Sequence, residues 1–194
     1  RKLYLKNSNS TINATTVSGA TLNAESVGIY IDGGRPTISN STISNNSIGI
    51  LVVSTTSNPT IQSNTFTGNT YPVKLESAVA ALSGNTATNN MYNGIFFEGA
   101  VLSNMTWQAD AIPYIANSFT VNAGATLTMQ AGVVVKFINL GYTNPELVVD
   151  GTLITQGTLA NPVVFTKISD DTVGGSNTYG GVGSLPTWKK IYIA

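Results

Sequence analysis

The stretch Ile38-Ser-Asn-Ser-Thr-Ile43, followed by Gly49-Ile50-Leu51-Val52, decides the fold because its pattern recurs along the chain. Three further stretches carry the same pattern: Val17–Leu22 with Gly28–Ile31, Ile61–Phe66 with Pro72–Leu75, and Leu82–Ala87 with Gly94–Phe97. The repeat is about 21 to 23 residues long. A repeat this short, with apolar and polar residues alternating between Asn, Gly, Ser and Thr turns, is typical of a solenoid whose coils are β-strands.

Within each repeat the residues after the glycine alternate with a period of two, as in a strand with one buried face. We therefore expect an inward set consisting of Ile29, Ile31, Ile50, Val52, Val73, Leu75, Ile95 and Phe97. Helices are not expected, because prolines are scattered along the chain and no apolar stripe keeps a helical period. Successive coils must pair in parallel, and parallel crossovers are almost always right-handed. The predicted fold is an all-β, right-handed parallel β-helix.

The whole chain, residues 1–194, is predicted to be one β-helix domain. Residues 1–100 form regular coils of about 21–23 residues, and residues 101–194 form longer coils with loops at 140–146 and 168–187. In this second part we expect Leu127 to stack on Leu153 and Phe137 to stack on Phe165. Both ends are expected to be uncapped, since strand patterns reach the first and last few residues.

The composition excludes several classes of function. Nine basic and nine acidic side chains give a formal net charge of zero, and only 9% of residues are charged. Nucleic-acid binding needs clustered Lys and Arg, so it is not expected. Membrane insertion is not expected either, because no apolar run is long enough to span a bilayer. The absence of Cys and His excludes disulfides, thiolate chemistry and a Ser-His-Asp triad.

The second half contains a run of related stretches: Gly124–Met129, Ala131–Phe137, Leu147–Leu153, Asn161–Thr166 and Trp188–Ile191. Together with the spacing of Gly49, Pro59, Asn64 and Asn69, they resemble a segment of large secreted bacterial and archaeal surface proteins. Those proteins belong to the right-handed parallel β-helix, pectate-lyase-like superfamily. The resemblance implies this fold and an extracellular, cell-surface location. It selects no activity, because the superfamily includes lyases, hydrolases, adhesins and structural arrays.

The expected function is structural and not enzymatic: a repeat or subunit of an extracellular surface protein, adhesin or filament. Trp188–Ala194 followed by Arg1–Leu5 reads as continuous solenoid. We therefore expect the chain to partner itself head to tail, by strand addition at its ends. The residues expected at this end-to-end interface are Leu3, Leu5, Trp188, Ile191 and Ile193. A piece taken from a longer β-helix would have the same ends.

An outward face offers the alternative of a carbohydrate-binding or polysaccharide-degrading β-helix. Its two columns are Tyr30, Leu51, Lys74 and Phe96, and beside them Asp32, Val53, Glu76 and Glu98. Glu76 and Glu98 should lie on adjacent coils roughly 5 Å apart, as carboxylates do in a retaining glycosidase or around Ca²⁺. Exposed aromatic side chains beside them would suit sugar rings, so a surface polysaccharide is a candidate partner. The simpler interpretation is that Lys74 offsets two solvated carboxylates.

Two sets of turn residues recur at fixed coil positions. Asn46, Asn69 and Asn90 share one position, and Asn64 and Asn85 share another. We expect amide ladders that bond coil to coil, the alternative being a polar ligand track. Thr columns made of Thr21, Thr42, Thr65 and Thr86 are explained by cross-strand hydroxyl bonds or, alternatively, by ice binding.

No cofactor is expected, although calcium is a candidate ligand. Asp170 and Asp171 lie in a Gly-rich loop, where carboxylates and backbone carbonyls together could bind Ca²⁺. Glycosylation sequons begin at Asn9, Asn13, Asn40, Asn45 and Asn104.

Overall fold

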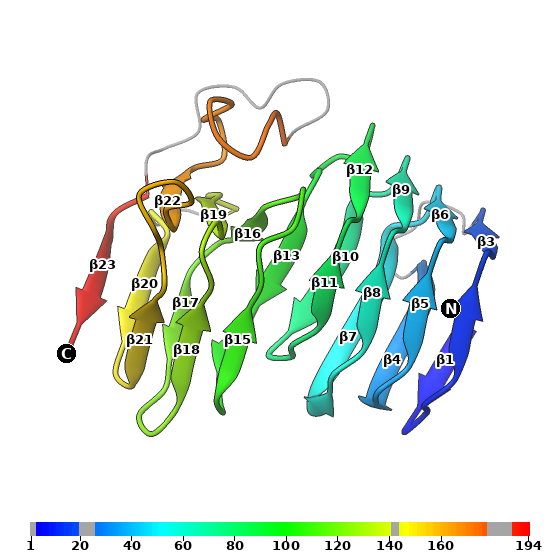
Figure 1. Cartoon of the computed structure of the whole chain (residues 1–194), viewed down its shortest axis with the longest axis horizontal. Helices are drawn as coiled ribbons and strands as arrows, with labels where there is room; N and C mark the ends of the chain where they lie inside the picture. The colour runs from blue at the N-terminus through cyan, green and yellow to red at the C-terminus, as the bar shows by residue number, and fades with distance from the viewer. Residues whose placement is uncertain (1–2, 20–25, 141–143, 178–187) are drawn as a thin grey trace.

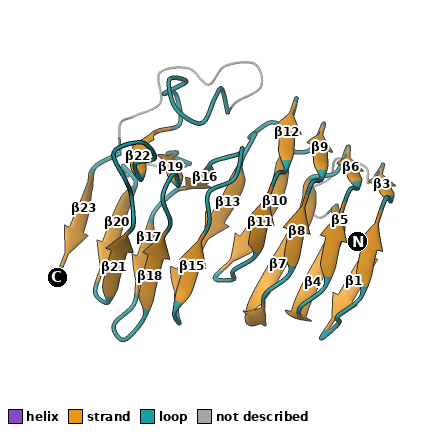
Figure 2. Ribbon diagram, viewed as in Figure 1, coloured by secondary structure: helices purple, strands orange, loops and turns teal. Residues whose placement is uncertain are grey.

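The computed structural model describes residues 3–19, 26–140, 144–177 and 188–194. These residues form a right-handed parallel β-solenoid, which confirms the predicted fold class (Figure 1). Figure 2 shows strands joined by loops, with no helix in the described part of the chain. In that part, accordingly, no helix is long and apolar enough to cross a membrane.

One sheet runs along the whole solenoid and takes one strand from each successive coil. We call it the long sheet, and its eight strands are all parallel. They are β1 (Leu3–Lys6), β4 (Val27–Gly34), β7 (Ile48–Ser57), β10 (Tyr71–Glu76), β13 (Ile95–Glu98), β16 (Tyr114–Ala116), β19 (Val134–Phe137) and β22 (Val164–Lys167).

Shorter side sheets close the coil, and they differ between the two halves of the chain. The first N-terminal side sheet consists of β2 (Thr11–Asn13), β5 (Thr37–Ser39), β8 (Thr60–Gln62) and β11 (Ala81–Ser83). The second consists of β3 (Thr16–Ser18), β6 (Thr42–Ser44), β9 (Thr65–Thr67) and β12 (Thr86–Thr88). The first C-terminal side sheet consists of β14 (Ala100–Val101), β17 (Phe119–Val121), β20 (Glu146–Val149) and β23 (Lys190–Ile193). The second consists of β15 (Met105–Trp107), β18 (Thr126–Met129) and β21 (Thr152–Thr155).

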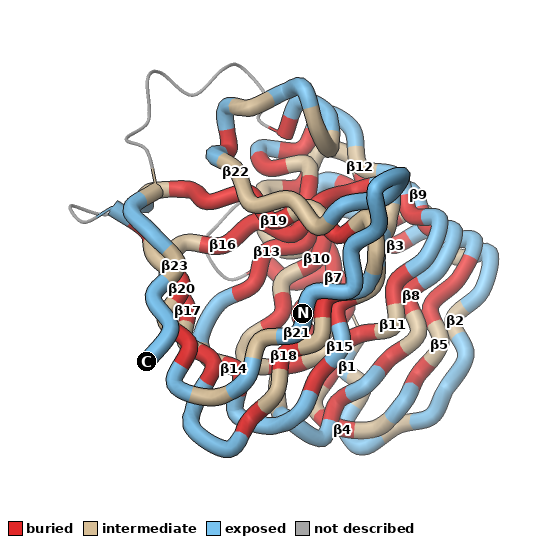
Figure 3. Tube along the Cα trace, turned by 60° about the vertical axis from the view of Figure 1, so that its left-hand side comes forward, coloured by how far each residue is buried: buried red, intermediate tan, exposed pale blue. Residues whose placement is uncertain are grey.

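The long sheet turns one set of side chains inward, as the alternation predicted. All of the predicted inward residues are at most 1% exposed. They stack in register along the axis, for example Ile29 on Ile50 and Val73 on Ile95. Figure 3 shows the resulting alternation of buried and more exposed positions along the coils. Since a fully buried aliphatic side chain contributes about 1.5–3 kcal/mol, these columns are a main source of stability.

The glycine of the recurring Gly-Ile pair is explained by the close approach of successive coils. A Cβ added to Gly49 would lie 2.4 Å from the backbone oxygen of Pro72, which belongs to the next coil. A Cβ added to Gly28 would lie 2.7 Å from the backbone oxygen of Gly49. A larger residue would therefore push neighbouring coils apart where the long-sheet strand begins.

The tight corners of the N-terminal coils require a left-handed backbone. Asn45, Gly68 and Asn89 occupy equivalent corners with φ values of 56°, 67° and 57°. Gly and Asn adopt this conformation at the lowest cost. The residue after each corner is an asparagine of the first predicted ladder, so the corner places that side chain inside the coil.

The predicted alignment of the first coil is wrong. Ile38 pairs with Ile12, and Val17 pairs with Ile43, whereas we expected Val17 to align with Ile38. Ile12, Val17 and Leu22 are spaced by five residues each, so the apolar pattern fits two registers. The first coil therefore exceeds the predicted length of 21–23 residues.

The same shift changes the first member of the Thr column. Thr16 pairs with Thr42, which pairs with Thr65. The predicted first member, Thr21, lies outside the described residues. Only hydroxyls at equivalent coil positions can line up, so among the described residues the Thr column begins at Thr16.

A second alignment is wrong near the C-terminal end. Leu127 pairs with Leu153 as predicted, but Phe165 pairs with Val135, and Phe137 pairs with Lys167. The strand β22 has two inward positions: Phe165 occupies the first and Lys167 the second, so only one of them is apolar. An inward column of the long sheet therefore ends in a lysine, and Lys167 is exposed.

The side sheets break once, and we call this break the seam. Strands β11 and β12 end the N-terminal side sheets, and β14 and β15 begin the C-terminal ones. The long sheet continues across the seam through the pairing of β13 with β16. On the side sheets, side chains bridge it instead: Gln108 Oε1 accepts a hydrogen bond from Leu82 N at 3.3 Å, and Ser77 Oγ accepts one from Ala100 N at 3.0 Å.

Aromatic side chains fill the core at the seam. The Trp107 and Tyr114 rings stack with centroids 4.3 Å apart and planes at 4°. Phe97 and Phe119 contact the same indole ring at 5.1 and 5.4 Å. All four residues are at most 3% exposed. The apolar core is therefore continuous where the side sheets are not.

Candidate functional site

The outward columns of the long sheet are arranged as predicted. Tyr30, Leu51, Lys74 and Phe96 lie side by side on consecutive strands, and Asp32, Val53, Glu76 and Glu98 lie beside them. The first column continues beyond the predicted residues through Ile115, Lys136 and Thr166. Sequence reasoning missed this continuation because the coils after residue 98 change length.

Lys74 lies between the two predicted carboxylates. Its Nζ is 3.0 Å from Glu76 Oε1 and 2.5 Å from Glu98 Oε2. Partial burial opposes the charged form of Lys74, but the hydrogen bonds to Glu98 and Glu76 outweigh burial and raise the pKa of its ammonium. The cluster carries a net charge of −1 at neutral pH, because one ammonium faces two carboxylates.

The aromatic part of the face is more covered than expected. Phe96 is 4% exposed and Leu51 is 7% exposed, so the expectation that both are exposed is wrong. Phe96 packs against Tyr71, with ring centroids 4.8 Å apart, and Tyr71 stacks on Tyr92 at 5.2 Å. Burial raises the pKa values of Tyr71 and Tyr92. Neither tyrosine was among the predicted face residues, although Tyr71 occupies the coil position of Val27 and Ile48.

A pocket of about 430 Å³ opens beside this cluster. Its lining residues are Tyr71, Lys74, Phe96, Phe97, Glu98, Asn117, Ser118 and Leu140. It thus combines an aromatic wall, the Lys74–Glu98 ion pair and an amide. This combination offers stacking and hydrogen bonding to a polar ligand, and it is the candidate ligand site of the chain.

The loop containing Asp170 and Asp171 is organised by protein groups. Asp170 accepts hydrogen bonds from Thr166 Oγ1 at 2.6 Å and from Thr172 Oγ1 and N at 2.6 and 3.0 Å. These bonds lower the pKa of the Asp170 carboxyl to about 2. Among the described residues no group of three or more His, Cys, Asp or Glu side chains could hold a metal ion. Calcium binding by Asp170 and Asp171 stays a prediction.

Lys136 supplies a positive charge to the same loop. Its Nζ donates hydrogen bonds to the backbone oxygens of Asp170 at 2.6 Å and Gly175 at 2.7 Å. The side chain is fully buried. Burial lowers the pKa of the Lys136 ammonium, while the carboxylates of Asp171 and Asp170 oppose that shift.

The predicted asparagine ladders are present inside the coils. Asn46 Nδ2 donates to Asn69 Oδ1 at 3.1 Å, and Asn69 Nδ2 donates to Asn90 Oδ1 at 2.9 Å. In the second ladder Asn64 Nδ2 donates to Asn85 Oδ1 at 3.2 Å. All five residues are at most 2% exposed, so the alternative of a ligand track is wrong.

The ladders end in residues that the sequence analysis did not single out. Asn93 Oδ1 accepts hydrogen bonds from Asn90 N and Nδ2, both at 3.0 Å. Asp110 accepts from Asn85 N at 3.1 Å and from Asn85 Nδ2 at 2.7 Å. Both acceptors lie beside the seam. The sequence has no asparagine at the next ladder position after Asn85 or Asn90. Asp110 and Asn93 supply the acceptors in its place.

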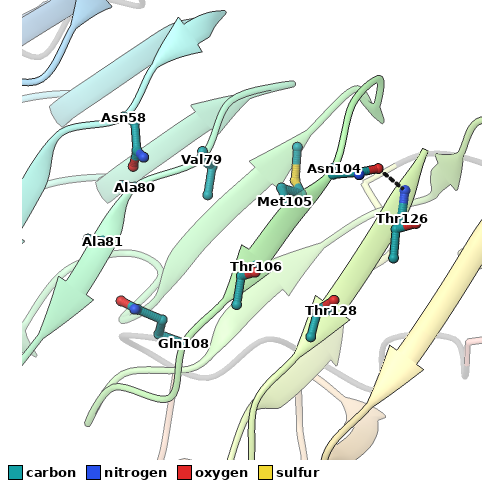
Figure 4. A pocket seen from close by; sticks show the side chains of 10 residues that line it. All are labelled: Asn58, Val79, Ala80, Ala81, Asn104, Met105, Thr106, Gln108, Thr126 and Thr128. Carbon is teal, nitrogen blue, oxygen red and sulfur yellow. Dashed lines mark hydrogen bonds between the residues drawn. The ribbon is translucent and has the colours of Figure 1, made fainter.

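A polar trough lies at the seam on the side away from the long sheet (Figure 4). It has a volume of about 410 Å³ and is lined by Asn58, Val79, Ala80, Ala81, Asn104, Met105, Thr106, Gln108, Thr126 and Thr128. Asn104 Oδ1 accepts a hydrogen bond from Thr126 N at 3.0 Å. The lining is uncharged, so this trough offers amide and hydroxyl groups but no ion pair.

The predicted end-to-end residues lie on edge strands of two different sheets. Leu3 and Leu5 lie on β1 of the long sheet, whereas Ile191 and Ile193 lie on β23 of a side sheet. The Trp188 ring stacks on Phe137 with centroids 5.0 Å apart. Except for Ile193, which is 69% exposed, these residues are partly buried against the core. A straight stack of two copies would therefore bring β22, not β23, against β1.

The sequon asparagines are on the surface. Asn9, Asn13, Asn40, Asn45 and Asn104 are all exposed. Glycosylation at these positions stays a prediction.

Two family comparisons match the chain, and they divide it at the seam. The family described as a right handed beta helix region matches residues 2–112, which is more than half of the chain. The family described as a pectate-lyase like beta helix domain matches residues 99–185. Neither the curated proteins nor the solved structures gave a match. With its coils, its ladders and these matches taken together, the chain belongs to the right-handed β-helix family.

Proposed function

We propose that the chain is a structural β-helix module of an extracellular surface protein, adhesin or filament, extended by further coils stacked on its ends. One observation carries this proposal: the polar groups best placed for chemistry are engaged in bonding within the fold. The buried amides link successive coils, Lys74 pairs with both carboxylates of the outward face, and Lys136 holds backbone oxygens of a loop. A molecule built in this way resists bending and separation of its coils.

The mechanical role follows from the direction of the bonds. Hydrogen bonds of the sheets and of both ladders run along the solenoid axis, and inward columns pack in the same direction. Pulling the ends apart would break many such bonds together, since on either side of the seam each coil is joined to the next on several sides. The proposed mechanism is therefore a stiff rod that separates or connects what lies at its two ends.

The end faces are the surfaces through which the rod would be extended. The strand β1 presents one edge of the long sheet and β22 presents the other. In a straight stack Phe165 would meet Leu3, and Lys167 would meet Leu5, because they continue the same inward columns. Burying an unpaired ammonium is costly, and an inward charge is a recognised protection of a sheet edge. Lys167 therefore weakens copy-to-copy stacking at this end.

Electron microscopy of the purified chain tests the proposal. We expect short rods that join end to end at high protein concentration, with β22 against β1 and with β23 and Trp188 beside them at the same junction. A variant lacking Trp188–Ala194 should remain as single rods, because the truncation removes an edge strand and uncovers Phe137. If the truncated variant joins end to end as readily as the full chain, the proposed interface is wrong. If the full chain never joins, end-to-end extension between copies is wrong.

A second candidate function is carbohydrate binding at the pocket beside Lys74. The observation in its favour is the aromatic wall of Tyr71 and Phe96 next to Glu98 and Asn117. Because the Lys74 cluster has a net charge of −1, we infer a neutral glycan rather than a uronic-acid polymer.

Titration calorimetry with neutral and uronic oligosaccharides tests this candidate, and a reducing-sugar assay tests turnover. Glu98→Gln should weaken the binding of a neutral glycan, while Asp32→Asn, in the same outward column but outside the pocket, should not. Absence of binding by any neutral oligosaccharide would leave the structural role as the better account. Turnover that Glu76→Gln or Glu98→Gln abolishes would instead establish an enzyme.

A further inference from the structure

The loop that follows β22 turns back along the solenoid (Figure 1). Its residues 168–177 lie over the outward face of the long sheet, and we call this segment the clasp. Ile168, at its start, is 1% exposed and packs with Phe96, Ile115 and Ile138. The clasp therefore covers an apolar cluster that would otherwise be exposed on the outward face of the long sheet.

The clasp is fixed in its middle by Lys136. This lysine stands in the outward column of β19, and its Nζ donates to the backbone oxygens of Asp170 and Gly175. Both bonds are short, and the side chain that makes them is fully buried. A buried ammonium without these acceptors would be strongly unfavourable. The clasp and Lys136 therefore stabilise each other.

The far end of the clasp is bonded to the other side of the seam. Asn177 Nδ2 donates to Asn93 O at 2.7 Å, and Asn93 N donates to Asn177 O at 2.9 Å. Asn177 is 2% exposed. Asn93 is also the residue whose side chain ends the first asparagine ladder. The clasp thus connects the last described long-sheet strand with the end of the N-terminal ladder.

These contacts matter because the seam is the weakest part of the backbone pairing. The side sheets are interrupted there and are bridged by a few side chains, while the long sheet alone continues. We propose that the clasp, closed by the Lys136 ammonium in place of a metal ion, couples the two halves of the solenoid so that they unfold as one unit. This role goes beyond the proposed rod function, and it holds whatever the chain binds.

Hydrogen–deuterium exchange across a urea series tests the proposal on the full chain. In the wild type we expect the clasp to be protected, with residues 26–98 and 114–167 losing protection at the same urea concentration. Chelation with EDTA should change neither result. In Lys136→Met the clasp should exchange at least about tenfold faster, because each hydrogen bond from a charged donor is worth roughly that factor. Its C-terminal half should then lose protection at a lower urea concentration than its N-terminal half.

Two further variants keep the test decisive. Lys74→Met removes a lysine of the same outward column whose ion pairs are with Glu76 and Glu98, so it should leave clasp exchange unchanged. Asn177→Ala removes the side-chain bonds from Nδ2 to Asn93 O and Gly174 O and keeps the backbone bond from Asn93 N to Asn177 O. It therefore weakens the far contact, and it should separate the unfolding of the two halves in the same direction if Lys136→Met fails to fold.

Three results would overturn the proposal. The first is a clasp that stays protected in Lys136→Met. The second is an open clasp with the two halves still unfolding together, which would assign the coupling to the long sheet. The third is an EDTA effect on the wild type, which would assign the closure to a metal ion.

Discussion

The asparagine ladders have a direction, and this direction gives the sharpest prediction. Asn69 accepts hydrogen bonds through Oδ1 from Asn46 of the preceding coil, and its Nδ2 donates to Asn90 of the next coil and to two backbone oxygens. The acceptors of Nδ2 are Ile43 O at 2.9 Å, Thr67 O at 3.2 Å and Asn90 Oδ1 at 2.9 Å. An aspartate has nearly the same shape but cannot donate when ionised. Asn69→Asp therefore keeps the accepting side of the ladder and removes the donating side.

The expected cost can be worked from these contacts. Asn69→Asp removes two buried N–H donors, at about 1–3 kcal/mol each, and places a carboxylate against the three oxygens they bonded, of which Thr67 O and Asn90 Oδ1 keep bonds from Asn45 N and Asn69 N. We expect a loss of about 4 kcal/mol or more in the free energy of unfolding at pH 7. Burial beside acceptors raises the pKa of the introduced carboxyl in the folded state above its unfolded value. Folding then favours the protonated form, so the defect should shrink as the pH falls toward that unfolded value.

The matched control is Asn93→Asp, at the end of the same ladder. The Asn93 side chain only accepts from Asn90, and in the second ladder the carboxylate of Asp110 already has this role. We therefore expect a change within about 1 kcal/mol. Urea unfolding followed by circular dichroism, at pH 7 and pH 4.5, measures both variants. The directional ladder is refuted if the two substitutions cost the same, or if Asn69→Asp costs less than about 1 kcal/mol.

Three other predictions test the outward face, the coil contacts and the sheet edge. Lys74→Met should lower the melting temperature mainly at low salt, because it leaves the carboxylates of adjacent coils without a positive partner. Glu98→Gln should change the melting temperature little, since Glu76 remains to pair with Lys74. Equal effects of the two substitutions would contradict the shared pairing. Gly49→Ala should cost about 2 kcal/mol or more in urea unfolding, because its Cβ would lie 2.4 Å from Pro72 O; a neutral result would mean that the coils can separate locally. Lys167→Val should increase end-to-end joining in sedimentation velocity by removing the inward charge from β22, and unchanged sedimentation would show that this edge is not what limits joining.

The sequence predicted the repetitive part of the fold almost residue by residue. In a solenoid each coil repeats the environment of the one before, so a column such as Ile29 and Ile50 is visible as a spacing. The amide ladders were predictable for the same reason. The first coil failed because Ile12 and Val17 present the same apolar spacing in two registers, and spacing alone cannot choose between them.

The candidate site was less predictable because its parts do not repeat. Lys74 and the two glutamates follow the columns and were found in advance. Asn117 and Leu140 line the same pocket from loops, where no periodicity marks them, and Tyr71 stands at a coil position that Val27 and Ile48 fill with aliphatic side chains. The burial of Phe96 depends on a loop that returns from much later in the chain, which is a contact between distant segments that local patterns do not encode.

The seam joins two kinds of β-helix coil, and its polar residues have the chemistry that such a junction needs. The last asparagine of each ladder needs an acceptor for its amide hydrogens. Asp110 and Asn93 are such acceptors, and both lie where the N-terminal side sheets end. The two family matches overlap over residues 99–112, which is the same place in the chain. The asparagine ladders of the N-terminal coils therefore end at the seam, and only the core, the long sheet and a few side chains continue through it. A contact that spans the seam, as the clasp does through Asn177, acts where the solenoid has least backbone pairing to lose.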